Sequence, residues 1–221
     1  MRLWPIMICA LLLSSCQLLP VGGSSGPAIQ GSGKLTTETR AISSFTAVEF
    51  ASFGTLMIEQ GSEESLTIAA EDNILPLLTS EVNDNILIIG INGAANTTRG
   101  IQYRLTVKAL DAITISGAGG IIIERFVAER LRVLLSGAGS LDISGSVGEQ
   151  EIEVAGAGSY NAPNLESRQA RVTINGLGNA VIRVSQSLDA TITGAGSVEY
   201  YGSPTVAQNV SGIGQVRQVQ P

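Results

Sequence analysis

The chain has 221 residues, of which 19 are acidic and 13 basic, with no histidine and a net charge of −6. An acidic chain without a basic cluster is unsuited to bind nucleic acid, and the absence of histidine removes the commonest general base and the commonest zinc ligand. A content of 44% hydrophobic and only 14% charged residues excludes a disordered chain.

The first sixteen residues have the features of an export signal. Arg2 gives a short positive start, and the apolar run through Leu13 is too short to span a membrane as a helix. The sequence LSSC that ends at Cys16 resembles a bacterial lipobox, so we expect residues 1–15 to be a lipoprotein signal peptide and Cys16 to be acylated. The residue after Cys16 is Gln17 and not aspartate. By resemblance to lipoprotein sorting in Gram-negative bacteria, this implies a location at the outer membrane. The alternative is an ordinary signal peptide in which Cys16 has no role.

Residues 16–33 are rich in glycine, serine and proline and almost uncharged, which is typical of a flexible tether. The only other cysteine, Cys9, lies in the export signal, so no disulfide is expected in the mature domain. We expect a single folded domain over residues 34–221.

Residues 34–112 predict short strands without a regular repeat. Residues 45–59 (FTAVEFASFGTLMIE) form a strand, a corner and a second strand, like a degenerate first coil. Further strands are expected at residues 66–69, 86–91 and 103–107. Residues 71–78 predict a short helical turn with Asp72 or Asn73 as its N-cap. We expect this irregular half to cover one end of the domain, because an uncovered sheet edge invites association.

From residue 113 to 221 a Gly-x-Gly corner returns six times. The leading glycines stand at 117, 137, 156, 176, 194 and 212, so the steps are 20, 19, 20, 18 and 18 residues. Apolar residues recur two and four positions before and four and six positions after the leading glycines, except for Gln208 and Gln218 around the last one, and this alternation is typical of strands with one buried face. The sequence therefore predicts an all-β fold, a right-handed parallel β-helix or β-solenoid with two short strands in each coil of about 19 residues.

Two physical explanations fit the paired glycines. Glycine in an ordered segment costs roughly 0.5–1 kcal/mol relative to alanine, so twelve of them must be required by the geometry. Either they adopt positive φ at a tight bend, or they occupy positions too crowded for a Cβ atom. Both glycines of each pair lie an even number of residues from the apolar positions, so they share the inward-facing register. This favours the crowding explanation. The residues between the glycines then form an outward, weakly apolar column: Ala118, Ala138, Ala157, Leu177, Ala195 and Ile213.

No set of residues predicts catalysis or cofactor or metal binding. Each Gly-x-Gly is followed by a strand, whereas a phosphate loop requires a helix there. Residues 137–142 (GAGSLD) resemble a calcium-binding repeat, but the aspartate does not recur in the other copies. Arg132 and Glu153 are expected on adjacent coils as a surface ion pair. We therefore expect no enzyme, no cofactor and no metal site.

Two segments between corners are the least constrained, residues 126–131 (FVAERL) and 162–168 (APNLESR), and we expect side chains that serve a partner there. Tyr160, Tyr200 and Tyr201 are candidate ligand contacts, because aromatic side chains are enriched at binding surfaces.

The segments EDNILPLLTSEVNDNILII and LTVKALDAITISGAGGI, with the repeated GAGS corners, resemble a bacterial family described as "putative auto-transporter adhesin, head GIN domain" over residues 42–221. The resemblance implies a β-helix-like fold in an exported protein, often a lipoprotein, and supplies no catalytic residues. Our leading hypothesis is a non-enzymatic lipoprotein anchored in the outer membrane, facing the periplasm or the surface, with an adhesin-like domain that binds a glycan or another envelope protein. The alternatives are a structural or assembly component of the envelope and a carbohydrate-active β-helix enzyme.

Overall fold

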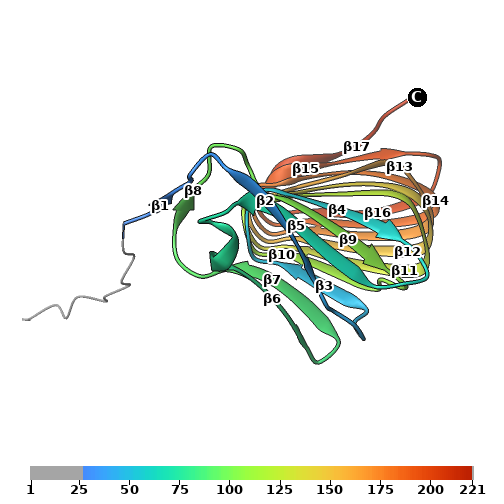
Figure 1. Ribbon diagram of the computed structural model, residues 1–221. Coiled ribbons are helices and arrows are strands. Elements are labelled where there is room, and N and C mark those ends of the chain that lie inside the picture. Colours follow the sequence, from blue (N-terminus) through green and yellow to red (C-terminus); the bar gives the residue numbers. More distant parts are fainter. Residues whose placement is uncertain (1–26, 221) are drawn as a thin grey trace, which may run out of the picture.

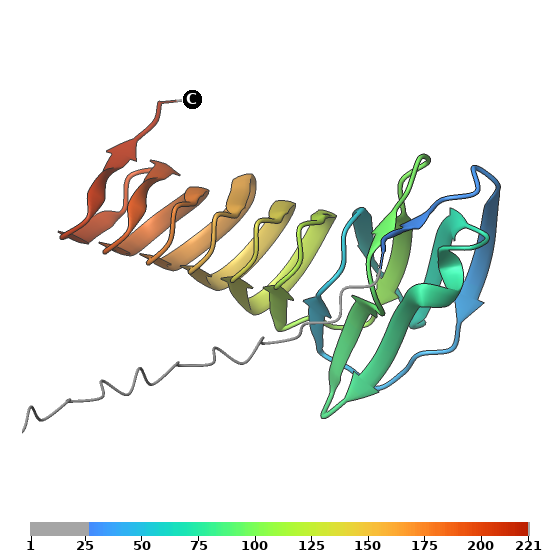
Figure 2. The ribbon, with the colours of Figure 1, turned by 90° about the vertical axis from the view of Figure 1, so that its left-hand side faces the viewer.

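A computed structural model of the protein describes residues 27–220. The regular secondary structure of this part of the chain is strand, apart from one 3-10 turn, η1 (Leu75–Leu77). Figure 2 shows the coils as a row of rungs, and in Figure 1, turned by 90°, they lie behind one another as a flattened loop. The expected signal peptide, Cys16 and the first part of the tether lie outside the described residues.

The regular half is a stack of parallel strands. Its strands are β10 (Ala112–Ile115), β11 (Gly120–Leu135), β12 (Ser140–Val154), β13 (Ser159–Ile174), β14 (Asn179–Ile192), β15 (Ala195–Tyr201), β16 (Thr205–Val210) and β17 (Ile213–Gln218). Along the stack the paired residues are Gly120, Ser140, Ser159, Asn179 and Ser197. These steps equal the spacing of the glycines, so the stacked-coil architecture predicted from the repeat is confirmed.

Each long strand bends once, away from its glycine corner (Figure 1). In β11 the pairing with β12 shifts between Ile123 and Phe126, and Arg125 between them has a φ of 57°. In β12 the corresponding bend contains Gly145, with a φ of 136°. The two strands expected in each coil are therefore the two parts of one continuous strand.

The apolar parity of the repeat corresponds to burial. The residue four positions after the leading glycine is at most 1% exposed in five successive coils: Ile121, Leu141, Tyr160, Ala180 and Val198. Full burial of one large apolar side chain contributes about 1.5–3 kcal/mol, and here each such contact is made with the coils above and below. In the last coil Gln208 and Gln218 take inward register positions and are exposed, so the apolar core ends there.

The glycine corners stack directly on one another. None of the twelve repeat glycines has a positive φ. A Cβ atom at Gly156 would lie closer than 3.0 Å to the carbonyl oxygen of Gly137, a separation that real Cβ atoms essentially never show. The same carbonyl accepts a hydrogen bond of 3.0 Å from the N–H of Ala157. The crowding explanation is confirmed, and the crowding group is the backbone of the preceding coil.

The expected degenerate first coil is present. β3 (Ala47–Phe50) pairs in parallel with β10, and β4 (Thr55–Gln60) pairs in parallel with β11. The carbonyl of Phe50 accepts hydrogen bonds from the N–H groups of Ser116 and Gly117 at 3.2 and 3.1 Å, so the two corners stack.

The order of coils in space differs from their order in the chain. β7 (Ile86–Ile91) and β9 (Gln102–Val107) form a further coil that pairs in parallel with β3 and β4 on the side away from β10. Outside it lie the antiparallel strands β6 (Leu78–Asn83), β5 (Ser65–Glu71) and β2 (Leu35–Arg40). The irregular half therefore covers the N-terminal end of the stack, as expected.

Residues 29–33, which the sequence assigned to a flexible tether, are bound to the folded domain. β1 (Ile29–Gln30) pairs with β8 (Ala95–Asn96). Buried Glu71 accepts hydrogen bonds from Thr97 Oγ1 and Thr98 Oγ1, both at 2.6 Å, and from the N–H of Gly33 at 2.8 Å, and these donors lower the pKa of its carboxyl to about 2. The composition of the tether could not show this, because its contacts use backbone groups and a distant carboxylate.

The helical turn is present as η1, but its expected caps are wrong. Ile74 is the N-cap residue, and no side chain caps the turn. Asp72 instead accepts a hydrogen bond from Ser32 Oγ at 2.6 Å, and Asn73 accepts one from the N–H of Ser32 at 2.9 Å. Both side chains thus hold the N-terminal segment.

Candidate functional site

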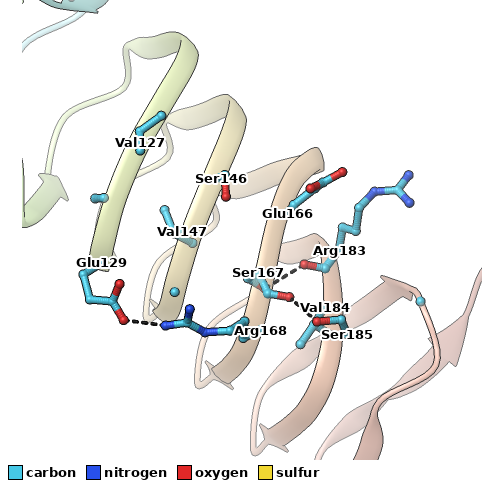
Figure 3. Close-up of a pocket in the computed structure, with 13 residues that line it drawn as sticks. Val127, Glu129, Ser146, Val147, Glu166, Ser167, Arg168, Arg183, Val184 and Ser185 are labelled. Carbon is cyan, nitrogen blue, oxygen red and sulfur yellow. Dashed lines mark hydrogen bonds and ion pairs between the residues drawn. The ribbon is translucent and has the colours of Figure 1, made fainter.

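A groove of about 510 Å³ runs along the stack in the described part of the chain (Figure 3). It crosses the bends of four successive coils. Its lining is Val127, Ala128 and Glu129 from β11, Ser146, Val147 and Gly148 from β12, Glu166, Ser167 and Arg168 from β13, Arg183, Val184 and Ser185 from β14, and Gly202. The two least constrained segments of the sequence, residues 126–131 and 162–168, both contribute to it.

The central row of the groove has only short side chains. Strand pairing makes this row Ala128, Val147, Ser167 and Val184, and Gly148 and Ser185 lie beside it. Ser185 Oγ donates to the carbonyl of Ser167 at 3.0 Å, so hydroxyls on the floor tie adjacent coils together.

Four charged side chains border the groove. Arg168 forms an ion pair with Glu129, two coils away, along one rim. On the other rim lie Glu166 and Arg183 (Figure 3). Arg183 Nε donates to the carbonyl of Pro163 at 2.7 Å, and the guanidinium carbon lies 5.1 Å from the centre of the Tyr201 ring. With two carboxylates and two guanidinium groups, the groove has no net formal charge.

Tyr160, an expected ligand contact, lies in the core beneath this groove. It is 1% exposed, and its hydroxyl donates to Gln150 Oε1 at 2.9 Å. Gln150 Nε2 donates to Ser167 Oγ at 2.7 Å, and Ser167 Oγ donates to the carbonyl of Arg183 at 2.7 Å. Burial raises the pKa of the Tyr160 hydroxyl, which therefore stays a neutral donor. This corrects the expectation for Tyr160: a ligand outside the coil cannot reach the ring, which instead supports the groove floor.

The other two tyrosines lie at the last full coil, both half-buried. Tyr200 packs against the apolar core. Tyr201 lies against Arg183 at the C-terminal end of the groove. Only Tyr201 is therefore close to the groove with accessible surface, and it reaches the groove through Arg183.

The expected ion pair between Arg132 and Glu153 is wrong by two residues. Arg132 pairs with Glu151, with Nε 2.9 Å from the carboxylate, because strand register brings these two residues side by side. The next two coils place Arg171 opposite Asp189 at 3.5 Å. The four residues form an alternating row of exposed charges, in which each pair contributes about 0–1 kcal/mol.

The chemistry of the groove is that of recognition by hydrogen bonds and small apolar contacts. Its carboxylates and guanidinium groups face a floor of hydroxyl and methyl groups, without aromatic side chains in the lining. Across residues 27–220 no three His, Cys, Asp or Glu side chains come close enough together to hold a metal ion. In the same part of the chain, no helix has the length and apolar character to cross a membrane.

Solved structures confirm the fold. A "putative adhesin" from Bacteroides fragilis NCTC 9343 superposes with a TM-score of 0.73 at 24% identity, covering 87% of this chain and 100% of that one. A "putative adhesin" from Parabacteroides distasonis ATCC 8503 gives a TM-score of 0.56 at 20% identity, and a "putative lipid binding protein" from the same strain gives 0.54 at 22%. Both alignments again cover 87% of this chain and 100% of the other. No curated protein matches the chain.

The family assignment comes from the sequence. The family model described as "Putative auto-transporter adhesin, head GIN domain" matches residues 44–204, from the first coil to the turn after β15. The matched region contains the complete groove and five of the six Gly-x-Gly corners. That description points to a protein of the cell envelope or cell surface. The chain belongs to the family of "putative auto-transporter adhesin, head GIN domain" proteins.

Proposed function

We propose that the protein is a non-enzymatic, adhesin-like binding module of the cell envelope and that the groove along the stack is its ligand surface. The observation that carries this proposal is the row of short side chains across four coils, Ala128, Val147, Ser167 and Val184, bordered by balanced charges. A long, shallow groove is suited to an extended polymer lying along it. The absence of net charge favours an uncharged glycan or a neutral segment of an envelope protein over a polyanion.

The proposal includes an anchor at Cys16. Acyl chains on this cysteine, each buried methylene contributing about 0.8 kcal/mol, would hold the protein at the outer membrane. Binding of residues 29–33 to the capped end leaves residues 17–28 as the spacer between anchor and domain. Metabolic labelling with a fatty-acid analogue tests this: Cys16→Ser should abolish labelling, and persistent labelling would refute acylation at Cys16.

The ligand surface is tested by filling the groove. Ser146 is exposed and pairs with Glu166 of the next coil, so a tryptophan there would add an indole ring at the Glu166–Arg183 rim of the groove (Figure 3). The matched control is Thr173→Trp, which adds the same ring to an outward position of β13 outside the groove. The mature protein is screened on a glycan array and by pull-down from envelope extracts, and each hit is then measured with both variants.

We expect Ser146→Trp to weaken binding at least tenfold, about 1.4 kcal/mol, and Thr173→Trp to leave it unchanged. Hits that bind both variants equally would refute the groove as the ligand surface. A screen without any hit would favour the structural role in the envelope.

A further inference from the structure

The two ends of the stack are built differently. The N-terminal end is covered by antiparallel strands. At the C-terminal end, within residues 27–220, β16 pairs only with β14, and β17 pairs only with β15. Each of these two strands therefore has one edge whose backbone N–H and carbonyl groups have no strand partner (Figure 2).

These edges lack the usual protection. Proteins protect edge strands with charges, proline, bulges or a covering segment. β16 has the sequence TVAQNV, without charge or proline, and its pairing with β14 is continuous from Thr205 to Val210. The one charge of β17, Arg217, is bound to Glu199 of its own neighbour β15. A six-residue uncharged edge of this kind is a template for another strand.

The last coil is not built for continued stacking. Gln208 and Gln218 stand where earlier coils have apolar side chains, and Gln218 Nε2 donates to the carbonyl of Gly202 at 2.7 Å. A partner that joins this end therefore gains strand hydrogen bonds at the rim and little new apolar core.

The spiral form of the chain specifies which partner fits. The chain enters the last glycine corner along β16 and leaves it along β17, so the two edges run in opposing directions, and β17 lies half a coil beyond β16. A two-fold axis along the bisector of the corner would place β17 of one copy against β16 of the other. Each of the two free edges then has a partner strand, and both strand pairs are antiparallel, as this isologous interface requires.

We propose that the C-terminal end of the stack is a homodimer interface, in which the free edges of β16 and β17 pair with β17 and β16 of a second copy. Because the two edges carry no unpaired charge, identical copies do not repel each other there. The outermost strands of the other end, β2 and β6, also have one free edge each, but these strands carry the charged residues Glu38, Arg40 and Glu81. Because a two-fold interface uses the same patch of both copies, association through the C-terminal end closes at two copies. The arrangement also accounts for Ile213, which is 84% exposed at the corner that lies next to the proposed axis.

Disulfide trapping tests the proposal in the full chain. Cysteine occurs otherwise only at positions 9 and 16, so Ile213→Cys adds one reporter close to the axis. The matched control is Leu177→Cys, at the same corner position two coils earlier and 69% exposed. On mild oxidation, we expect Ile213→Cys to give disulfide-linked dimers as the main product and Leu177→Cys to remain at the level of the unmodified chain.

Gln208→Lys in the Ile213→Cys background places an inward charge at the edge and should reduce the linked dimer at least tenfold. Sedimentation velocity of the unmodified chain should show a dimer that Gln208→Lys converts to a monomer. Equal trapping of the two cysteine variants, trapping that survives Gln208→Lys, or a monomeric unmodified chain would each overturn the proposal.

Discussion

Replacement of Gly156 by alanine tests the physical basis of the corner. The added Cβ would overlap the carbonyl oxygen of Gly137 in the preceding coil. That oxygen is backbone, and it is held by the hydrogen bond from the N–H of Ala157 at 3.0 Å. The overlap can therefore be relieved only if the two coils move apart at the corner.

The cost follows from three contributions. Overpacking of this kind costs about 1–3 kcal/mol, and the weakened hydrogen bond adds about 0.5–1.5 kcal/mol. Reduced entropy of the unfolded chain returns about 0.4–1 kcal/mol. We expect a net loss of about 2–3 kcal/mol, which for a domain of this size lowers the melting temperature by about 4–12 °C.

Thermal unfolding followed by circular dichroism provides the measurement, and Gly120→Ala provides the matched control. A Cβ atom at Gly120 would meet only Ser140 Oγ, at 3.3 Å, and this side chain can rotate away. The control should melt within about 2 °C of the unmodified protein, because the substitution should change the free energy of unfolding by less than about 1 kcal/mol. Equal melting temperatures for both variants would refute the argument that carbonyl crowding requires the glycines.

Two further predictions concern buried polar groups. Glu71 has a folded pKa of about 2, below its ordinary value of 4.5, so the stability it contributes is present above pH 4.5 and is lost as the pH falls toward 2. Glu71→Gln should therefore lower the melting temperature at pH 7 and flatten its decline between pH 4.5 and 2, and an unchanged decline would contradict this role. Tyr160→Phe leaves Gln150 Oε1 without its donor in the core and should cost about 1–3 kcal/mol in denaturant unfolding, with a loss below 0.5 kcal/mol as the contradicting result.

The sequence is informative wherever one residue type has one physical use. The period of the glycines predicted which residues pair, since the corner tolerates no change of register: Gly156 must lie over Gly137. The parity of the apolar residues likewise placed Ile121 and Leu141 in the core. The same parity places Tyr160 in the core. The prediction that it contacts a ligand was wrong because it rested on the aromatic side chain and not on its inward-facing position in the strand.

Other features depend on relations that a linear sequence does not contain. β3 pairs with both β7 and β10, so a later segment lies outside an earlier coil, and no local pattern encodes that order. The binding of Gly33 to Glu71 joins residues that the sequence separates into a tether and a strand. The groove is hidden for a related reason. Register shifts at the bends place Ala128 beside Val147 and Ser167 beside Val184, so the paired residues that line it do not stand at equal distances from their leading glycines.

The position of the groove follows from the rigidity of the corner. The coils differ in length by up to two residues, and the corner cannot absorb the difference. Every register shift accordingly lies at or beside the bends, between Ile123 and Phe126, between Asp142 and Ser144, and on either side of Glu166 and Ser167. Side chains beside the bends are therefore the ones that can change size and spacing while the stack stays intact. A binding surface that must adapt to a ligand is best placed on this side of the coil, and this is where the groove lies.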